Sequence, residues 1–339
     1  MHFYYGQALW QIFTPFFGLS FLPLTIFFCM SSIIRVSNLS KIFNEIKAVD
    51  DLSFTVEEGD VYGFLGQNGA GKSTTIRMLL TLVKPSNGRI LIFGKDLYSN
   101  RKEILQQVGA IIEKPDLYKY LSAYDNLRIF AKLSGVNPRR ELLMKQLEMV
   151  GLASRAGSKV KTFSQGMKQR LGIAVALVHD PRLIILDEPT NGLDPQGIAD
   201  MRNLVIQLSK EMGKTVVVSS HLLSEIELMA NRILIIDKGK KIVEGSATEL
   251  LDPAKTIVQV DTTDNQAAKS KLIQTRWAPF LLQSEGLLRL QMNKADIPYL
   301  AGELVNLAIP VLSIQPRHSL EDYFLSLTTP NRHVEPLTN

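Results

Sequence analysis

One stretch decides the fold of this chain: Val61-Tyr62-Gly63-Phe64-Leu65-Gly66-Gln67-Asn68-Gly69-Ala70-Gly71-Lys72-Ser73-Thr74. A short apolar run is followed by the pattern G-x-x-x-x-G-K-[ST], the phosphate-binding P-loop. Its glycines let the backbone curl so that several N–H groups point at one phosphate, and the helix that follows adds its positive dipole end. We predict that the loop binds a nucleotide phosphate, that Lys72 offers charge to the β- and γ-phosphates, and that Ser73 ligates Mg²⁺. A glycine-rich turn without a ligand is the alternative.

A second motif ends another apolar run, Leu183–Leu186, in Asp187-Glu188-Pro189. Successive side chains of a strand point to opposite faces, so the two acids are expected to have different tasks. Asp187 is predicted to hold Mg²⁺ beside Ser73, and Glu188 to polarise the water that attacks the γ-phosphate. Acids at a strand end are often merely solvated, but the P-loop upstream favours the catalytic interpretation.

A histidine, His221, follows the apolar run Thr215–Ser219. A lone histidine is more often structural. Just past a buried strand of a phosphate-binding domain, it is a candidate for contacting the γ-phosphate or orienting the water.

Strand-like apolar runs alternate with amphipathic runs of helical length after Met30, which is typical of an α/β domain with a largely parallel sheet. The expected strands are Ile33–Val36, Leu52–Val56, Val61–Leu65, Arg89–Phe93, Leu183–Leu186, Thr215–Ser219 and Ile233–Ile236. The expected helices are Ala123–Leu133, Glu141–Val150, Gly166–Val178 and Ile198–Met212.

A boundary signal, Asp252-Pro253, separates this domain from a smaller one. The smaller domain is expected to be α+β, with strands Thr256–Asp261 and Val311–Gln315, helices Asn265–Thr275 and Ile297–Leu307, and a hairpin within Phe280–Met292. Ser319 and Asp322 could cap a last helix through Leu327. We expect domains at residues 31–251 and 252–328 and a polar tail at 329–339.

The first thirty residues contain no Asp, Glu, Lys or Arg. The segment Ala8–Met30 is long enough to cross a bilayer, although Pro15 and Pro23 interrupt it. It could be a membrane anchor, a membrane-surface tail, or an extension outside the natural protein with translation starting at Met30. We favour the last interpretation.

The composition excludes some classes. The chain has 339 residues, a net charge of +5 and 45% hydrophobic residues, so it is neither low-complexity nor mostly disordered. Its single cysteine excludes an internal disulfide framework and a cysteine-based zinc site. The mild positive charge suits nucleic acid, an anionic membrane or a phosphate ligand alike.

The segment Phe163-Ser164-Gln165-Gly166-Met167 lies between the P-loop and the acid pair. It resembles the LSGGQ signature of the nucleotide-binding subunits of ABC transporters, although Gln165 replaces the first glycine and Met167 replaces the glutamine. The alternative is a helix capped by a serine without a role in nucleotide binding. The resemblance implies that Ser164, Gln165 and Gly166 of one subunit close over the ATP held by a second subunit.

Other segments match the same family. Gly192-Leu193-Asp194-Pro195 is similar to the D-loop that joins the two halves of a dimer, which adds Asp194 to the nucleotide-contacting set. His221 takes the place of the switch histidine. Phe43 is in place for the aromatic residue that stacks on adenine, with Val49 beside it; a core aromatic is the alternative.

One position departs clearly from the family pattern. Where the family usually has a glutamine after the strand leading to the helical insert, this chain has Glu113. A carboxylate can meet Mg²⁺ but cannot donate a hydrogen bond. This variant and Gly166-Met167-Lys168-Gln169-Arg170 resemble the branch of bacitracin- and lantibiotic-type efflux ATPases, and the C-terminal domain resembles the accessory domain of that branch.

The resemblance implies an ABC-type P-loop NTPase fold: α/β, with a parallel-rich sheet, an antiparallel β subdomain, a helical insert around residues 114–178, and a small C-terminal α+β domain. It implies a subunit that binds and hydrolyses ATP with Mg²⁺ and powers a separate membrane-spanning permease, an exporter of drugs, peptides or lipids. A second ATP-binding subunit, expected to be another copy, and a location at the cytoplasmic face of the membrane also follow.

The alternative is a soluble ABC-type ATPase that acts on a ribosome or a nucleic-acid complex. A ribosomal type would normally carry two such domains, whereas this chain has one P-loop. A chromosome type would need a long coiled-coil insert, for which the stretch from Lys72 to Asp187 is too short. We therefore expect no nucleic-acid partner.

Overall fold

The computed structural model describes residues 32–252, 256–282, 286–317 and Leu320. The predictions for residues 1–30, for the capping of a last helix and for the polar tail fall outside the described residues. Among the described residues, no helix has the length and apolar character needed to cross a bilayer.

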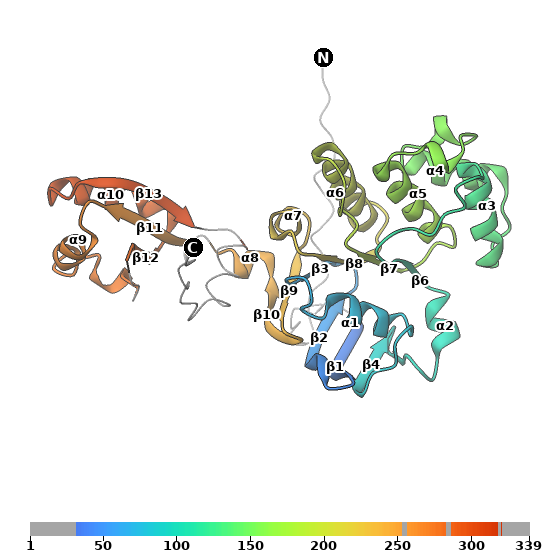
Figure 1. Cartoon of the computed structure of the whole chain (residues 1–339), viewed down its shortest axis with the longest axis horizontal. Coiled ribbons are helices and arrows are strands. Elements are labelled where there is room, and N and C mark those ends of the chain that lie inside the picture. Colours follow the sequence, from blue (N-terminus) through green and yellow to red (C-terminus); the bar gives the residue numbers. More distant parts are fainter. Residues whose placement is uncertain (1–31, 253–255, 283–285, 318–319, 321–339) are drawn as a thin grey trace, which may run out of the picture. The chain divides into compact units, whose positions relative to one another are not determined.

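A six-stranded sheet in the order β10-β9-β3-β8-β7-β6 forms the centre of the larger part (Figure 1). Its strands are β3 (Val61–Leu65), β6 (Val108–Ile111), β7 (Leu183–Asp187), β8 (Thr215–Ser220), β9 (Arg232–Asp237) and β10 (Lys240–Ser246). Neighbouring strands run parallel except β10, which is antiparallel to β9. This confirms the predicted parallel-rich α/β fold.

Both faces of this sheet are buried, which explains why its strands are continuous apolar runs. In β7, Ile184 and Leu186 pack with one core cluster, whereas Leu183 and Ile185 pack with the other. Helices α5, α6 and α7 pack on one face, with α3 and α4 against α5, and α1 lies on the other face with a second sheet (Figure 1). The helices of this part are α1 (Lys72–Leu79), α2 (Arg101–Leu105), α3 (Ala123–Leu133), α4 (Arg140–Met149), α5 (Gln165–Leu177), α6 (Pro195–Lys210), α7 (Leu223–Glu227) and α8 (Ala247–Leu250).

The second sheet is antiparallel and has the order β2-β1-β4-β5. Its strands are β1 (Ser32–Phe43), β2 (Ile46–Glu57), β4 (Asn87–Ile92) and β5 (Lys95–Asp96). Strand β1 is much longer than predicted. It contains the left-handed residue Asn38 and register shifts against β2, so its apolar alternation breaks after Val36 although the pairing continues.

The C-terminal residues form a three-stranded antiparallel sheet in the order β12-β11-β13 with a core of its own. Its elements are β11 (Thr256–Thr262), α9 (Asn265–Leu272), β12 (Leu288–Met292), α10 (Ile297–Asn306) and β13 (Val311–Arg317). Trp277, only 4% exposed, belongs to this core.

The predicted hairpin within Phe280–Met292 is present only in part. Ala278–Phe280 form a 3-10 turn, and the first arm is reduced to a single bridge between Leu281 and Leu290. Pro279 explains the turn, because its fixed φ and missing N–H oppose a strand. Strand β10 was missed because charged residues such as Lys241 and Glu244 leave it no apolar run.

Candidate functional site

The sheet brings the predicted site residues to one edge. Strand β3 is paired in parallel with β8, so that Leu65 lies opposite Ser220, and Asp187 of β7 lies opposite Ser219. The segments that follow these strands are the P-loop, the acid pair and His221, and they therefore meet at the carboxyl ends of the strands, where α/β folds bind ligands.

The P-loop backbone is fixed by its glycines. Gly71 has a φ of 105°, and a Cβ atom there would lie 2.6 Å from the carbonyl oxygen of Ala48. A Cβ at Gly66 would lie 2.5 Å from the carbonyl oxygen of Ile236. Any larger residue at these two positions would force the loop away from β2 or β9.

Lys72 begins α1 and is almost fully buried. Its ammonium group donates to the carbonyl oxygens of Gly66 at 2.8 Å and Gln67 at 3.3 Å. The adjoining pocket has a volume of about 180 Å³ and is lined by Ala48, Asn68, Gly69, Gly71, Lys72, Ser73, Thr74 and Glu188. Ala70 is buried beneath the loop.

Ser73 and Asp187 lie together as predicted, and Ser219 joins them. The hydroxyl groups of Ser73 and Ser219 donate to Oδ1 of Asp187 at 3.3 and 2.5 Å. Oδ2 of Asp187 is buried and has no hydrogen-bond partner in the described part of the chain. A hydroxyl beside a carboxylate oxygen without a partner is the donor set that suits Mg²⁺, so these residues fit that ion.

Glu188 occupies the middle of the site. Its Oε1 lies 3.2 Å from Nζ of Lys72, and its Oε2 lies 2.7 Å from Nδ1 of His221. The residue has a φ of 50°, and its N–H donates to both the carbonyl and the hydroxyl oxygen of Ser219. This left-handed turn directs Glu188 away from the strand that positions Asp187.

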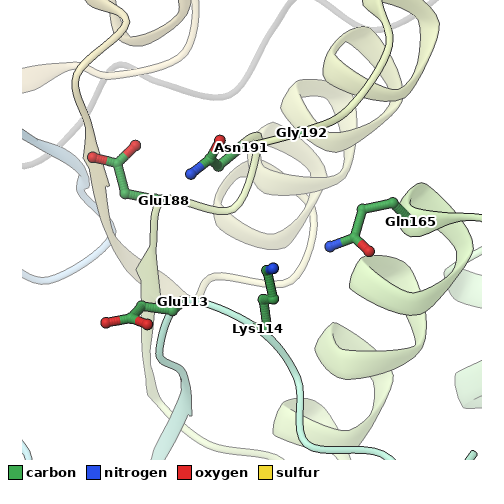
Figure 2. A pocket seen from close by; sticks show the side chains of 6 residues that line it. All are labelled: Glu113, Lys114, Gln165, Glu188, Asn191 and Gly192. Carbon is green, nitrogen blue, oxygen red and sulfur yellow. The ribbon is translucent and has the colours of Figure 1, made fainter.

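A second pocket of about 530 Å³ adjoins Glu188 and is lined by Glu113, Lys114, Gln165, Glu188, Asn191 and Gly192. Figure 2 shows Lys114 and Gln165 extending toward the middle of this pocket, whereas the carboxylates of Glu113 and Glu188 point to one side. Gln165 is the only one of the three predicted signature residues among those lining residues.

The signature segment and the D-loop both form helix starts. Ser164 is the N-cap of α5 and accepts from the N–H of Met167 at 3.2 Å. Asp194 is the N-cap of α6 and accepts from the N–H of Gly197 at 3.1 Å. Gln165 and Gly166 lie in the first turn of α5, where the helix supplies no backbone acceptor for their N–H groups, so these two groups can bind an anion.

Phe43, Val49 and Glu113 do not line the P-loop pocket. Phe43 is 44% exposed at the end of β1, with the ammonium group of Lys41 4.8 Å from its ring centre. Val49 is completely buried, so its side chain packs in the core, and its neighbour Ala48 lines the pocket instead. Glu113 forms an ion pair with Arg77.

Sequence reasoning missed Ala48, Ser219 and Asn191. Ala48 is apolar, and Asn191 has a polar amide but belongs to none of the motifs quoted from the sequence. Ser219 had a usable signal, because a hydroxyl ends a buried strand next to the one that ends in Asp187.

Comparison with known proteins agrees with this geometry. Residues 49–191 match the family model described as ABC transporter. The bacitracin transport ATP-binding protein of Bacillus licheniformis is 43% identical, over 88% of this chain and 98% of its own length. The lantibiotic transport ATP-binding protein of Streptococcus pyogenes is 43% identical over 62% of this chain and 90% of its length.

A solved structure has the same fold. It is a dimeric ATP-binding cassette in a post-hydrolysis state, bound to ADP and Pi. It is 26% identical and superposes with a TM-score of 0.57, covering 63% of this chain and 98% of its own.

Proposed function

The chain belongs to the ABC transporter family of ATP-binding proteins, and from this premise we propose that it hydrolyses ATP to drive export through a separate membrane protein. One observation carries the hydrolytic part of the proposal. A single carboxylate, that of Glu188, lies between the P-loop lysine and a histidine, next to a serine–aspartate pair that suits a metal ion.

The residues of the P-loop would hold the nucleotide. Backbone N–H groups of the loop would hold the β- and γ-phosphates, and Lys72 would exchange its carbonyl partners for phosphate oxygens. Ser73 and Asp187 would hold Mg²⁺, which when bound offsets the negative charge of these phosphates.

Glu188 and His221 would position and activate the attacking water molecule. Once Lys72 turns to the phosphates, Oε1 of Glu188 is free to accept a hydrogen bond from the attacking water. The hydrogen bond between Nδ1 of His221 and Oε2 of Glu188 remains, and it fixes the orientation of the carboxylate. Closure of the site would exclude other water.

A second copy of the chain is proposed to complete the site. Within the described residues, none that lines the P-loop pocket comes from Ser164, Gln165 or Gly166. In this proposal the signature segment that contacts ATP comes from the other subunit, with Asp194 near the contact between the two copies. The dimeric cassette found among solved structures supports this arrangement.

A membrane-spanning permease is the proposed partner of the helical insert. Exposed apolar side chains gather there at Tyr118, Tyr120 and Leu133, with exposed fractions of 52, 78 and 72%. Exposed aromatic side chains are typical of contact surfaces. This partner would place the chain at the cytoplasmic face of the membrane.

The cargo class is proposed from the relatives alone. Their names refer to bacitracin and to a lantibiotic, both peptide antibiotics. We therefore favour export of amphipathic peptides over export of lipids or other drugs.

The test is reconstitution with a membrane-spanning partner that co-purifies with this chain. ATP hydrolysis by the complex in vesicles should be stimulated by bacitracin or a lantibiotic, and cells expressing both subunits should tolerate more peptide. A complex carrying Glu188→Gln is the control and should give neither effect. If the chain purifies with ribosomes or nucleic acid and never with the permease, the soluble alternative replaces this proposal.

A further inference from the structure

The C-terminal part of the chain contains a pocket that the proposed ATPase chemistry does not use. It has a volume of about 270 Å³ and is lined by Arg276, Trp277, Phe280, Asp296 and Tyr299. The first three residues lie in the segment between α9 and β12, and the other two lie at the start of α10. Two segments on either side of β12 therefore build one recess.

Three of the lining side chains are aromatic. Trp277 is only 4% exposed, and its ring centre lies 5.8 Å from that of Phe280, with the two planes tilted by 55°. Phe280 and Tyr299 are more open to solvent, with exposed fractions of 40 and 64%. The faces of aromatic rings attract organic cations, and sites for quaternary ammonium groups are built from such rings. The pocket can therefore receive the cationic end of a ligand.

The pocket also contains two opposite charges that do not pair. Among the described residues, neither Arg276 nor Asp296 forms an ion pair, with each other or with any other residue. Asp296 is the N-cap of α10 but accepts no capping hydrogen bond, whereas the N-cap residues Asp194 and Asp264 both do. Both charges are thus available to a ligand that supplies their opposites.

The indole N–H of Trp277 lacks an acceptor. Its Nε1 is buried and has no hydrogen-bond partner in the part of the chain that the structure describes. Buried tryptophan side chains usually find a partner for this group, and a buried donor without one costs free energy. The guanidinium of Arg276 lies 4.9 Å from the centre of the same ring. An anionic group that pairs with Arg276 would therefore bring an acceptor close to Trp277.

We propose that this pocket binds a small zwitterion, a molecule with an ammonium group at one end and a phosphate or carboxylate group at the other. Asp296 and the rings of Phe280 and Tyr299 would receive the ammonium group, and Arg276 would receive the anionic group. The volume lies just below the range of about 300–1,000 Å³ found for drug-sized ligands, so it suits a small metabolite or a lipid headgroup.

The test is calorimetric titration of the full-length chain with phosphocholine and with glycine betaine, which carry the phosphate and the carboxylate form of this chemistry. Choline and inorganic phosphate, each with only one of the two charged groups, are the matched controls. At least one zwitterion should bind about tenfold more tightly than either control, because it gains a second charge-assisted contact. Absence of saturable binding of both zwitterions, or equal affinity for a zwitterion and a control, would overturn the proposal.

Variants of the two charged residues test whether binding occurs in this pocket. Arg276 is exposed and Asp296 half-buried, so Arg276→Met and Asp296→Asn should leave the core intact, which urea unfolding verifies. Each should weaken zwitterion binding about tenfold. Arg289→Met removes an exposed arginine of β12 that does not line the pocket and should leave the affinity unchanged. Wild-type affinity in both pocket variants would place the ligand elsewhere and overturn the assignment.

Vesicles of phosphatidylcholine distinguish the two sources of the ligand. Retention of the wild-type chain that Arg276→Met abolishes would identify a lipid headgroup. Binding of a zwitterion in solution, with no retention or with equal retention of Arg276→Met, would identify a free metabolite. None of the five residues lines the P-loop pocket, so failure of this inference leaves the proposed ATPase function unaffected.

Discussion

At the scale of single residues, the site depends on the division of labour between two neighbouring acids. Asp187 is fully buried at the end of β7 and receives two hydroxyl groups, whereas Glu188 turns into a left-handed conformation and contacts Lys72 and His221. Strand alternation directs the two side chains to different faces, and the turn at Glu188 moves them farther apart. The hydroxyl of Ser219 contacts both acids, since it accepts from the N–H of Glu188 and donates to Asp187.

Replacing Glu188 by glutamine should leave ATP binding intact and reduce hydrolysis by about 10²–10⁴-fold. The amide has nearly the same shape but cannot accept the proton of the attacking water, and loss of a general base typically has this magnitude. The variant should also accumulate as an ATP-bound dimer, visible by size-exclusion chromatography with light scattering. Wild-type turnover by this variant would remove Glu188 from the catalytic role.

A second prediction concerns His179, whose burial lowers its pKa below the ordinary value of 6.5. The ring stays neutral, with Nε2 3.2 Å from the carbonyl oxygen of Val108. Because the unfolded chain binds a proton more readily, the stabilising contribution is complete above pH 6.5 and is lost as the pH falls through the lower, folded-state pKa.

Urea unfolding followed from pH 7.5 to pH 5 should therefore show falling stability. His179→Gln should flatten that fall. A slope identical in wild type and His179→Gln would contradict the prediction.

The sequence predicted those site residues that belong to short, continuous motifs. The P-loop, Asp187, Glu188 and His221 follow buried strands, and parallel strands bring such positions to one edge. Val49 shows the limit, because the family pattern that put it beside Phe43 cannot tell a buried side chain from one that lines a pocket. The partner of Glu113 was also invisible, since Arg77 is 36 residues away and carries no motif of its own.

At the scale of elements, the helical insert is joined to the sheet through close backbone contacts. A Cβ at Gly109 of β6 would lie 2.3 Å from the carbonyl oxygen of Ala176 in α5. The buried strands of the six-stranded sheet were predictable from their runs of β-branched residues. The antiparallel strand β10 was not, because half-exposed charged strands resemble loops in sequence.

Substituting Gly109 by alanine should separate β6 from α5 and lower the free energy of unfolding by about 1–3 kcal/mol, the usual cost of overpacking a core. Gly157→Ala is the matched control, because no atom lies within 4 Å of a Cβ built there. Thermal and urea unfolding of both variants measure the difference. Equal stability of the two variants would show that α5 can move aside at little cost.

At the scale of the whole molecule, the chain has more than one hydrophobic core. The clusters on the two faces of the six-stranded sheet share its strands, whereas the cluster built from residues 258–309 uses only β11, β12 and the elements near them. The boundary proposed at Asp252-Pro253 lies between the sheet clusters and the C-terminal cluster, and across it only Leu320 of the described residues joins a sheet cluster. Separate cores predict separate unfolding, because cooperativity follows shared packing.

Calorimetry should therefore resolve two transitions, and ATP with Mg²⁺ should raise only the one that belongs to the P-loop part. At a ligand concentration of 100 times the dissociation constant, the expected stabilisation is about 2.7 kcal/mol. Leu290→Ala should lower only the other transition, because Leu290 is fully buried in the C-terminal core. A single transition that moves as a whole with ATP would show that the cores are coupled.

The position of Trp277 has a spectroscopic consequence. The chain contains two tryptophans, Trp10 and Trp277. In a Trp10→Phe protein, Trp277 becomes the sole indole emitter, buried in the C-terminal core with the guanidinium of Arg276 4.9 Å from its ring centre. Its emission then reports whether that core is intact. A change in emission on adding ATP would show that nucleotide binding alters the environment of Trp277 in the C-terminal core.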